Sequence, residues 1–153
     1  MREQQALLHA KGAGAPEVNE EARLSAVLVP LAPKQTAAEA FEFTERVCGM
    51  VAQLKPELVS LVAETLPRRG RLYLDCVQNY QGKTLVLPYS VRAVDGAPVS
   101  APLEWSEVTT ALEPRAFNIK TMRARLDAKG DLFAPLLDGQ VVLAPLIARL
   151  RGA

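Results

Sequence analysis

Residues 68–92 read RRGRLYLDCVQNYQGKTLVLPYSVR, and this stretch decides the fold of the 153-residue chain. Apolar and polar residues alternate over 72–77, as in a strand with one buried face. Turn-forming residues follow at 78–82, and a second apolar run at 83–87 predicts a return strand. The pattern predicts a β-hairpin with Leu72, Leu74 and Cys76 on one face and Asp75 on the other.

Asp75 is the one acidic residue of this hairpin. A carboxylate in the middle of a strand needs water, a cation or a hydrogen-bond donor, because its burial alone is costly. In one interpretation Asp75 lies on a solvated face and pairs with Arg71 or Lys83. In the other it belongs to a functional site, which agrees with the local concentration of positive charge in a chain of net charge +1. The basic residues of this region are Arg68, Arg69, Arg71, Lys83 and Arg92.

The composition is that of one globular domain, since 49% of the residues are apolar. No apolar run reaches the length of a membrane span and the start lacks a signal-peptide pattern, so we expect a cytoplasmic protein. We expect Cys48 and Cys76 to be small apolar core residues rather than halves of a disulfide. With His9 as the single histidine and no close pair of cysteines, a structural zinc site is not expected.

The most strongly marked element is a helix predicted over residues 36–55. Thr36 and Glu39 have the spacing of a capping box, which satisfies free N–H groups at the start of a helix. Pro56 ends the helix. Its predicted inner face, which would cover a sheet, is formed by Ala37, Phe41, Thr44, Val47, Cys48, Val51 and Leu54.

The remaining elements are shorter. Residues 25–31 form a compact apolar run typical of a buried strand, and residues 4–11 suit a short helix. A second helix is predicted over 121–129, with Gly130 as its stop. Residues 141–150 are amphipathic and predict a docking helix, with contact of Val142, Leu146 and Leu150 with a partner as the alternative. Trp105 has no aromatic residue near it in sequence, so we expect it to anchor packing rather than to stack on bases.

These elements predict a mixed α/β (α+β) fold. A small, mostly antiparallel sheet would be covered by the one long helix, with short helices toward the C-terminus. We expect residues 1–24 to be a flexible tail, residues 25–137 to form the domain, and residues 138–153 to form a C-terminal helix.

Several motifs in order carry a family resemblance. Residues 75–79 (DCVQN), 82–84 (GKT) and 88–92 (PYSVR) are followed by residues 96–105 (GAPVSAPLEW) and 117–119 (FNI). From about residue 27 to about residue 137, the chain resembles the primase-polymerase domain of bacterial DNA ligase D, in the archaeo-eukaryotic primase superfamily. The resemblance implies a partial primase-polymerase fold and a role in repairing broken DNA ends by non-homologous end joining, in the bacterial cytoplasm at the nucleoid.

The resemblance also implies roles for single residues. Such domains transfer a nucleotide to a DNA 3′ hydroxyl with two divalent ions, Mg²⁺ or Mn²⁺, that bracket the reacting phosphate. Asp75 matches the third of three metal-binding aspartates, so it is the candidate catalytic residue and metal ligand. Gln78 and Arg92 stand where the family contacts the incoming nucleoside triphosphate. Arg68 matches a basic position of the same site, and Lys83 is a candidate neighbour of the phosphates.

Two family motifs are absent. The chain contains no Asp-x-Asp pair, and Ala26 stands where the histidine of a Ser-Gly-x-x-Gly-x-His motif is expected. One carboxylate cannot organise two magnesium ions. The chain thus resembles the C-terminal half of the domain, and we expect no meaningful polymerase activity from it alone.

Three hypotheses follow. The chain is a truncated or split polymerase that acts with a separate chain carrying the missing half, since open strand edges recruit further strands. Alternatively, it is a non-catalytic remnant that binds a DNA end or a nucleotide, with steeply salt-dependent affinity. The third hypothesis is a gene fragment with no retained role.

Overall fold

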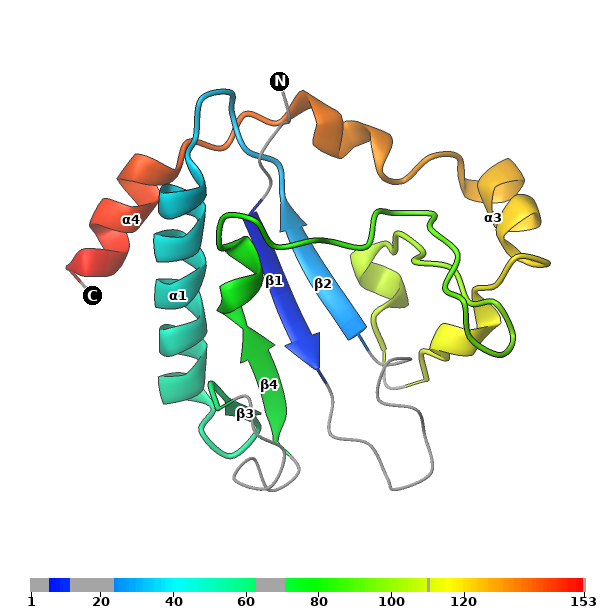
Figure 1. The fold of residues 1–153 in the computed structure, drawn as a ribbon, viewed down its shortest axis with the longest axis horizontal. Helices are drawn as coiled ribbons and strands as arrows, with labels where there is room; N and C mark the ends of the chain where they lie inside the picture. Colours follow the sequence, from blue (N-terminus) through cyan, green and yellow to red (C-terminus); the bar gives the residue numbers. More distant parts are fainter. Residues whose placement is uncertain (1–5, 12–23, 63–70, 110, 153) are drawn as a thin grey trace. The chain divides into compact units, whose positions relative to one another are not determined.

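The computed structural model describes residues 6–11, 24–62, 71–109 and 111–152 (Figure 1). The chain divides into two compact units. The first consists of Met1–Thr84 with Asp138–Ala153, and the second of Leu85–Leu137. Each unit is described by itself.

The first unit is built on a four-stranded sheet. Its strands are β1 (Ala6–Lys11), β2 (Leu24–Val29), β3 (Val59–Ser60) and β4 (Leu72–Asp75), in the spatial order β2-β1-β4-β3. β1 pairs antiparallel with both β2 and β4, whereas β3 lies parallel to β4. The predicted small, mostly antiparallel sheet is confirmed.

β1 corrects two expectations. The short helix predicted over residues 4–11 is wrong, and so is the flexible tail for residues 6–11, because Ala6–Lys11 form an inner strand of the sheet. β1 pairs with β2 along its whole length, from Ala6 opposite Val29 to Lys11 opposite Leu24. So short a segment is a marginal helix by itself, and pairing on both sides satisfies its backbone better. Residues 12–23 lie outside the described residues.

The predicted hairpin is also wrong. β4 ends at Asp75, the chain turns into the 3₁₀ helix η2 (Cys76–Asn79), and residues 83–87 form no strand. The physical reason lies in the strand order. β4 stands between β1 and β3, so both of its edges are already paired and no edge is left for a return strand.

Helix α1 (Ala37–Leu54) confirms the predicted helix and its capping box. The Glu39 backbone N–H donates to Thr36 Oγ1 at 3.2 Å, and the Thr36 N–H donates to Glu39 Oε2 at 2.7 Å. α1 contacts β1, β3 and η2 (Figure 1). Its buried Cys48 packs with Val59 and Leu74, while Leu54, which was expected on the inner face, is 68% exposed in the last turn.

Helix α4 (Leu143–Arg151) packs against α1, as Figure 1 shows, so the predicted docking helix is confirmed. Leu143 and Ile147 form a buried cluster with Leu31 and Ala40. The segment that leads into α4 packs closely against the segment before α1. The backbone of Leu31 pairs there with that of Val141, two residues after Gly139.

The second unit contains helix α3 (Met122–Lys129) and little other regular structure. α3 confirms the predicted helix, and Gly130 ends it with a φ of +71°. The short 3₁₀ helices are η3 (Trp105–Glu107), η4 (Pro114–Ala116) and η5 (Ala134–Asp138), whose last residue already belongs to the first unit. The expectation that Trp105 anchors packing is wrong, because the residue is 76% exposed on η3.

The whole is a mixed α/β fold, as predicted. Within the described residues, no helix combines the length and the apolar character that a bilayer crossing requires.

Candidate nucleotide site at the end of β4

Asp75 lies at the end of β4, beside an inner strand of the sheet. Its backbone stands opposite that of His9 in the register of β1 and β4. The Asp75 side chain is half-buried and accepts a long hydrogen bond, 3.4 Å, from the hydroxyl of Tyr73 to Oδ1. Asp75 is therefore accessible to a ligand while a neighbouring donor supports its carboxylate.

Gln78 follows in the turn that Asp75 begins. Asp75 is the N-cap of η2, and Gln78 stands three residues further on, within the same 3₁₀ helix. Asp75 and Gln78 thus lie within four consecutive residues at the end of β4, both half-buried, and the exposed Lys83 follows after the turn.

A buried hydrogen bond fixes η2 on the long helix. Asn79 Nδ2 donates to Thr44 Oγ1 at 3.1 Å, and the Thr44 hydroxyl in turn donates to the carbonyl of Ala40 at 2.9 Å. Beside it, the rings of Tyr80 and Phe41 meet edge to face, with centroids 5.2 Å apart. These contacts hold the turn that carries Asp75 and Gln78 in one position.

Arg92 belongs to the second unit, whereas Asp75, Gln78 and Lys83 belong to the first. Arg92 is half-buried, and its backbone N–H donates to the carbonyl of Pro98 at 2.8 Å. The structure therefore groups three of the predicted site residues within one unit and describes Arg92 in the other. Arg68, the fifth, lies outside the described residues.

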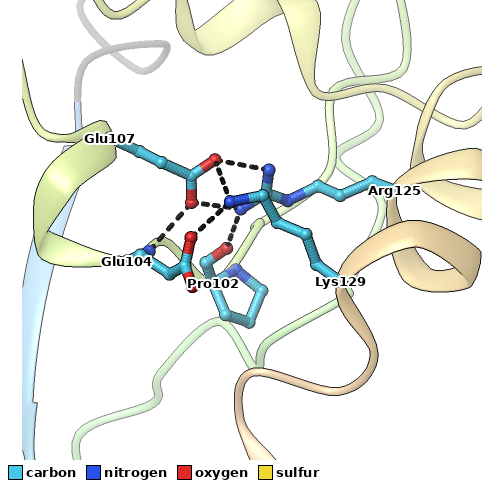
Figure 2. Close-up of polar contacts among 5 residues, drawn as sticks. All are labelled: Pro102, Glu104, Glu107, Arg125 and Lys129. Atoms are coloured by element: carbon cyan, nitrogen blue, oxygen red, sulfur yellow. Dashed lines mark hydrogen bonds and ion pairs between the residues drawn. The ribbon is translucent and has the colours of Figure 1, made fainter.

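The strongest polar cluster of the second unit joins η3 to α3 (Figure 2). Arg125 donates to both carboxylate oxygens of Glu107, at 2.7 and 2.6 Å, and to the carbonyl of Pro102 at 2.9 Å. Lys129 pairs with Glu104 and Glu107. Arg125 also lies 5.0 Å from the ring centre of Phe117.

This cluster changes the acidity of Glu107. The Arg125 hydrogen bonds lower the pKa of Glu107 to about 2, against the effect of partial burial. The pKa of Arg125 is raised by the same pair. Both groups are ionised at neutral pH, and a bidentate arginine–carboxylate pair is a geometrically specific bond. The cluster therefore holds η3 against α3 within the second unit, and its charged side chains are paired with one another rather than available for a reaction.

The described residues do not by themselves fit a pair of metal ions. Within the part of the chain that the structure describes, no group of three or more His, Cys, Asp or Glu side chains is arranged to hold one ion. The nearby thiols are poor ligands, because burial raises the pKa of Cys48 to about 12 and also raises that of Cys76. Asp75 is a single carboxylate ligand, which is too few to hold two ions.

The sequence did not identify all the residues that support the site. Tyr73, which donates to Asp75, was expected only as an alternating strand residue, and Asn79 only as a turn residue. Asn79 is the last residue of the DCVQN motif at 75–79, and its place in that motif was the sequence feature that could have marked it as part of the site. Nothing local indicated that its amide would bond to Thr44, a residue of the long helix.

Comparisons with known proteins identify the family of the chain. Residues 25–133 match the family model described as LigD, primase-polymerase domain. The chain belongs to the LigD primase-polymerase family. It is 36% identical over 103 residues to the bifunctional non-homologous end joining protein LigD of Bacillus subtilis. It is 37% identical over 108 residues to the multifunctional non-homologous end joining protein LigD of Mycolicibacterium smegmatis.

A solved LigD domain has the same fold. The structure matches the polymerase domain of Mycobacterium tuberculosis ligase D in complex with DNA with a TM-score of 0.71 and 24% identity, over 88% of this chain and 44% of that one. The LigD matches cover 67% and 71% of this chain but only 17% and 14% of the B. subtilis and M. smegmatis proteins. The chain therefore corresponds to part of a LigD polymerase domain, within much longer relatives.

Proposed function

We propose that this chain supplies the nucleotide-binding part of a LigD-type primase-polymerase that acts at broken DNA ends in non-homologous end joining. The observation that carries the proposal is the turn at the end of β4, which begins at Asp75, includes Gln78 and is bonded to the long helix through Asn79. The family match over residues 25–133 and the DNA-bound state of the solved M. tuberculosis domain support it. Such work would take place at the bacterial nucleoid.

Each side chain has a chemical task in this proposal. The Asp75 carboxylate is a hard oxygen donor for one divalent cation, Mg²⁺ or Mn²⁺. Gln78 both donates and accepts hydrogen bonds, so it reads a sugar or a base edge. The planar guanidinium of Arg92 donates hydrogen bonds to phosphate oxygens, and Lys83 and Arg68 add positive charge for the phosphates.

The same chemistry predicts that the chain does not polymerise by itself. The chain has no Asp-x-Asp pair, so two further carboxylates must come from elsewhere. We propose that a polypeptide with the remaining half of the domain completes the site. When bound, two ions would supply charge neutralisation at the reacting phosphate, and Asp75 would be one of their ligands.

Binding of a fluorescent ATP analogue to the purified chain, with manganese present, tests the proposal. Replacing Arg92 by Ala should weaken the affinity about tenfold, since a charged hydrogen bond is removed. Asp75→Asn and Gln78→Ala should also weaken it. Matched controls are Arg115→Ala for Arg92 and Gln81→Ala for Gln78, because both control side chains are exposed and outside the site. Equal affinities of the Arg92, Asp75 and Gln78 variants and the parent chain would refute the site.

Extension of a labelled primer with a recessed DNA end tests the incomplete catalytic site. We expect no extension by the chain alone with magnesium or manganese. Steady extension would show that the site is complete without an Asp-x-Asp pair. DNA binding should weaken steeply as salt rises, and Lys83→Ala should weaken it more than Lys55→Ala, an exposed lysine at the end of α1.

A further inference from the structure

Tyr89 has an unusual backbone conformation. Its φ is +64°, in the left-handed region that glycine favours and bulky side chains rarely adopt. Residues held in such conformations cluster at functional sites, where the surrounding structure must hold them in place. Tyr89 stands three residues before Arg92, in the PYSVR motif at 88–92.

Tyr89 is held at both its side chain and its backbone. Its hydroxyl donates to Asp131 Oδ1 at 2.6 Å, across 42 residues of sequence, and its N–H donates to the carbonyl of Ser100 at 2.8 Å. Asp131 is itself fixed, because Oδ1 accepts the N–H of Phe133 at 2.9 Å. The hydrogen bond from Tyr89 lowers the pKa of Asp131, while burial and the same bond raise the pKa of Tyr89, so the hydroxyl keeps its proton at neutral pH.

A short backbone ladder connects Tyr89 to Arg92. Ser100 N–H donates to the carbonyl of Ser90 at 3.0 Å, and Arg92 N–H donates to that of Pro98 at 2.8 Å. The residues between Arg92 and Pro98 turn back through a hydrogen bond from Ala97 to Val94. Tyr89 begins one side of this ladder, so its conformation sets the direction in which the backbone enters the segment of Arg92.

We propose that the Tyr89–Asp131 pair positions Arg92 for phosphate binding. This inference rests on the proposed function, because it assigns a positioning residue to the same site. The Tyr89 hydroxyl bonds to Asp131, and the backbone of Tyr89 begins the ladder that leads to Arg92. Tyr89 therefore acts through the backbone, and its hydroxyl holds the left-handed conformation in which the chain enters the Arg92 segment.

A double-mutant cycle on ATP-analogue affinity tests the inference. Tyr89→Phe removes the hydroxyl and keeps the ring, and it should weaken affinity about three- to tenfold, the range expected for coupled neighbours. In the Arg92→Ala background the same change should have no further effect. Ser106→Ala, which removes an exposed hydroxyl from the second unit, is the control and should leave affinity unchanged.

Asp131 provides a second route to the same result. Asp131→Ala should reproduce the loss seen in Tyr89→Phe, whereas Asp131→Asn keeps an acceptor oxygen and should restore most of the affinity. Melting temperatures of all variants accompany the cycle. If Tyr89→Phe does not fold, the cycle of Asp131→Ala with Arg92→Ala decides the question.

The outcomes separate the two proposals. If Arg92→Ala leaves affinity unchanged, the assignment of Arg92 in the proposed site fails, and its positioning fails with it. If Arg92→Ala weakens binding but the Tyr89→Phe effect adds to it in full, the nucleotide site stands and the positioning role is refuted. Coupling together with Asp131→Asn rescue supports the positioning role, since a loss of general stability would not depend on Arg92.

Discussion

The amide of Asn79 donates a buried hydrogen bond, 3.1 Å long, to the hydroxyl of Thr44, a residue 35 positions earlier in the chain. Thr44 is fully buried on α1, and Asn79 ends the turn that begins at Asp75. This one bond connects the long helix to the turn that carries the candidate nucleotide-binding residues. Its loss should therefore affect both stability and the site.

Asn79→Ala should lower the free energy of unfolding by about 1–3 kcal/mol, because the Thr44 hydroxyl loses a partner in the interior. Chemical denaturation followed by circular dichroism measures this change. Gln81→Ala, in the exposed turn just beyond, is the control and should be neutral. An Asn79→Ala variant as stable as the parent would show that the bond contributes nothing to the fold.

The Glu107–Arg125 pair predicts a dependence of stability on acid. The pKa of Glu107 in the folded chain, about 2, lies below the ordinary value of 4.5. The contribution of the pair to stability is therefore complete above pH 4.5 and is lost as the pH falls toward 2. We expect about 2 kcal/mol from this partly buried pair. Denaturation at a series of pH values should show that Glu107→Gln removes this part of the acid sensitivity.

A contrasting pair on α3 serves as the control for that experiment. Arg123 and Asp127 form an i, i+4 pair whose side chains are 85% and 62% exposed. Such surface pairs contribute about 0.3–0.5 kcal/mol. Asp127→Asn should therefore change the pH profile little, and a loss as large as that of Glu107→Gln would contradict the assignment to the Glu107 pair.

Trp105 should contribute little to stability despite its size. Because its side chain lies on the surface of η3, we expect Trp105→Ala to change the free energy of unfolding by less than about 0.5 kcal/mol. Leu143→Ala, at a fully buried residue of α4, should cost about 2–5 kcal/mol. Thermal melts compare the two directly, and a strongly destabilised Trp105→Ala would show that the ring is packed after all.

Replacement of glycine by alanine should destabilise the chain at Gly139 and stabilise it at Gly49. A Cβ at Gly139 would lie 2.5 Å from the carbonyl oxygen of Leu31 and 2.7 Å from the carbonyl carbon of Pro30. Backbone cannot move aside easily, so Gly139→Ala should cost about 1–3 kcal/mol.

At Gly49, within α1, a Cβ meets no atom within 4 Å. Gly49→Ala should therefore stabilise the chain by about 0.5–1 kcal/mol, since alanine is the better helix former. Denaturation midpoints of the two variants measure both effects. Destabilisation by both substitutions, or by neither, would contradict the close approach of Gly139 to the segment before α1.

The helices were predictable because their signals are local. The Thr36–Glu39 capping box and the Gly130 stop act within one turn of their own helices, and the structure keeps both. The inner face of α1 was predicted in part. Thr44 and Cys48 are buried as expected, whereas Leu54 is exposed, since periodicity does not tell where the neighbouring sheet ends.

The sheet was less predictable because its pairing is not local. The apolar run at 83–87 has the composition of a strand, yet a strand also needs an open edge, and β1 and β3 already occupy both edges of β4. The short segment Ala6–Lys11 carries no strong strand signal and nevertheless lies within the sheet.

The sequence by itself determined the family, the long capped helix, and the spacing of Asp75, Gln78 and Arg92, because each depends on the order of neighbouring residues. Only the tertiary structure decided that a 3₁₀ turn follows Asp75, that Asn79 fastens this turn to Thr44, and that Asp131 holds Tyr89. These contacts join residues far apart in sequence, and chain folding alone brings them together.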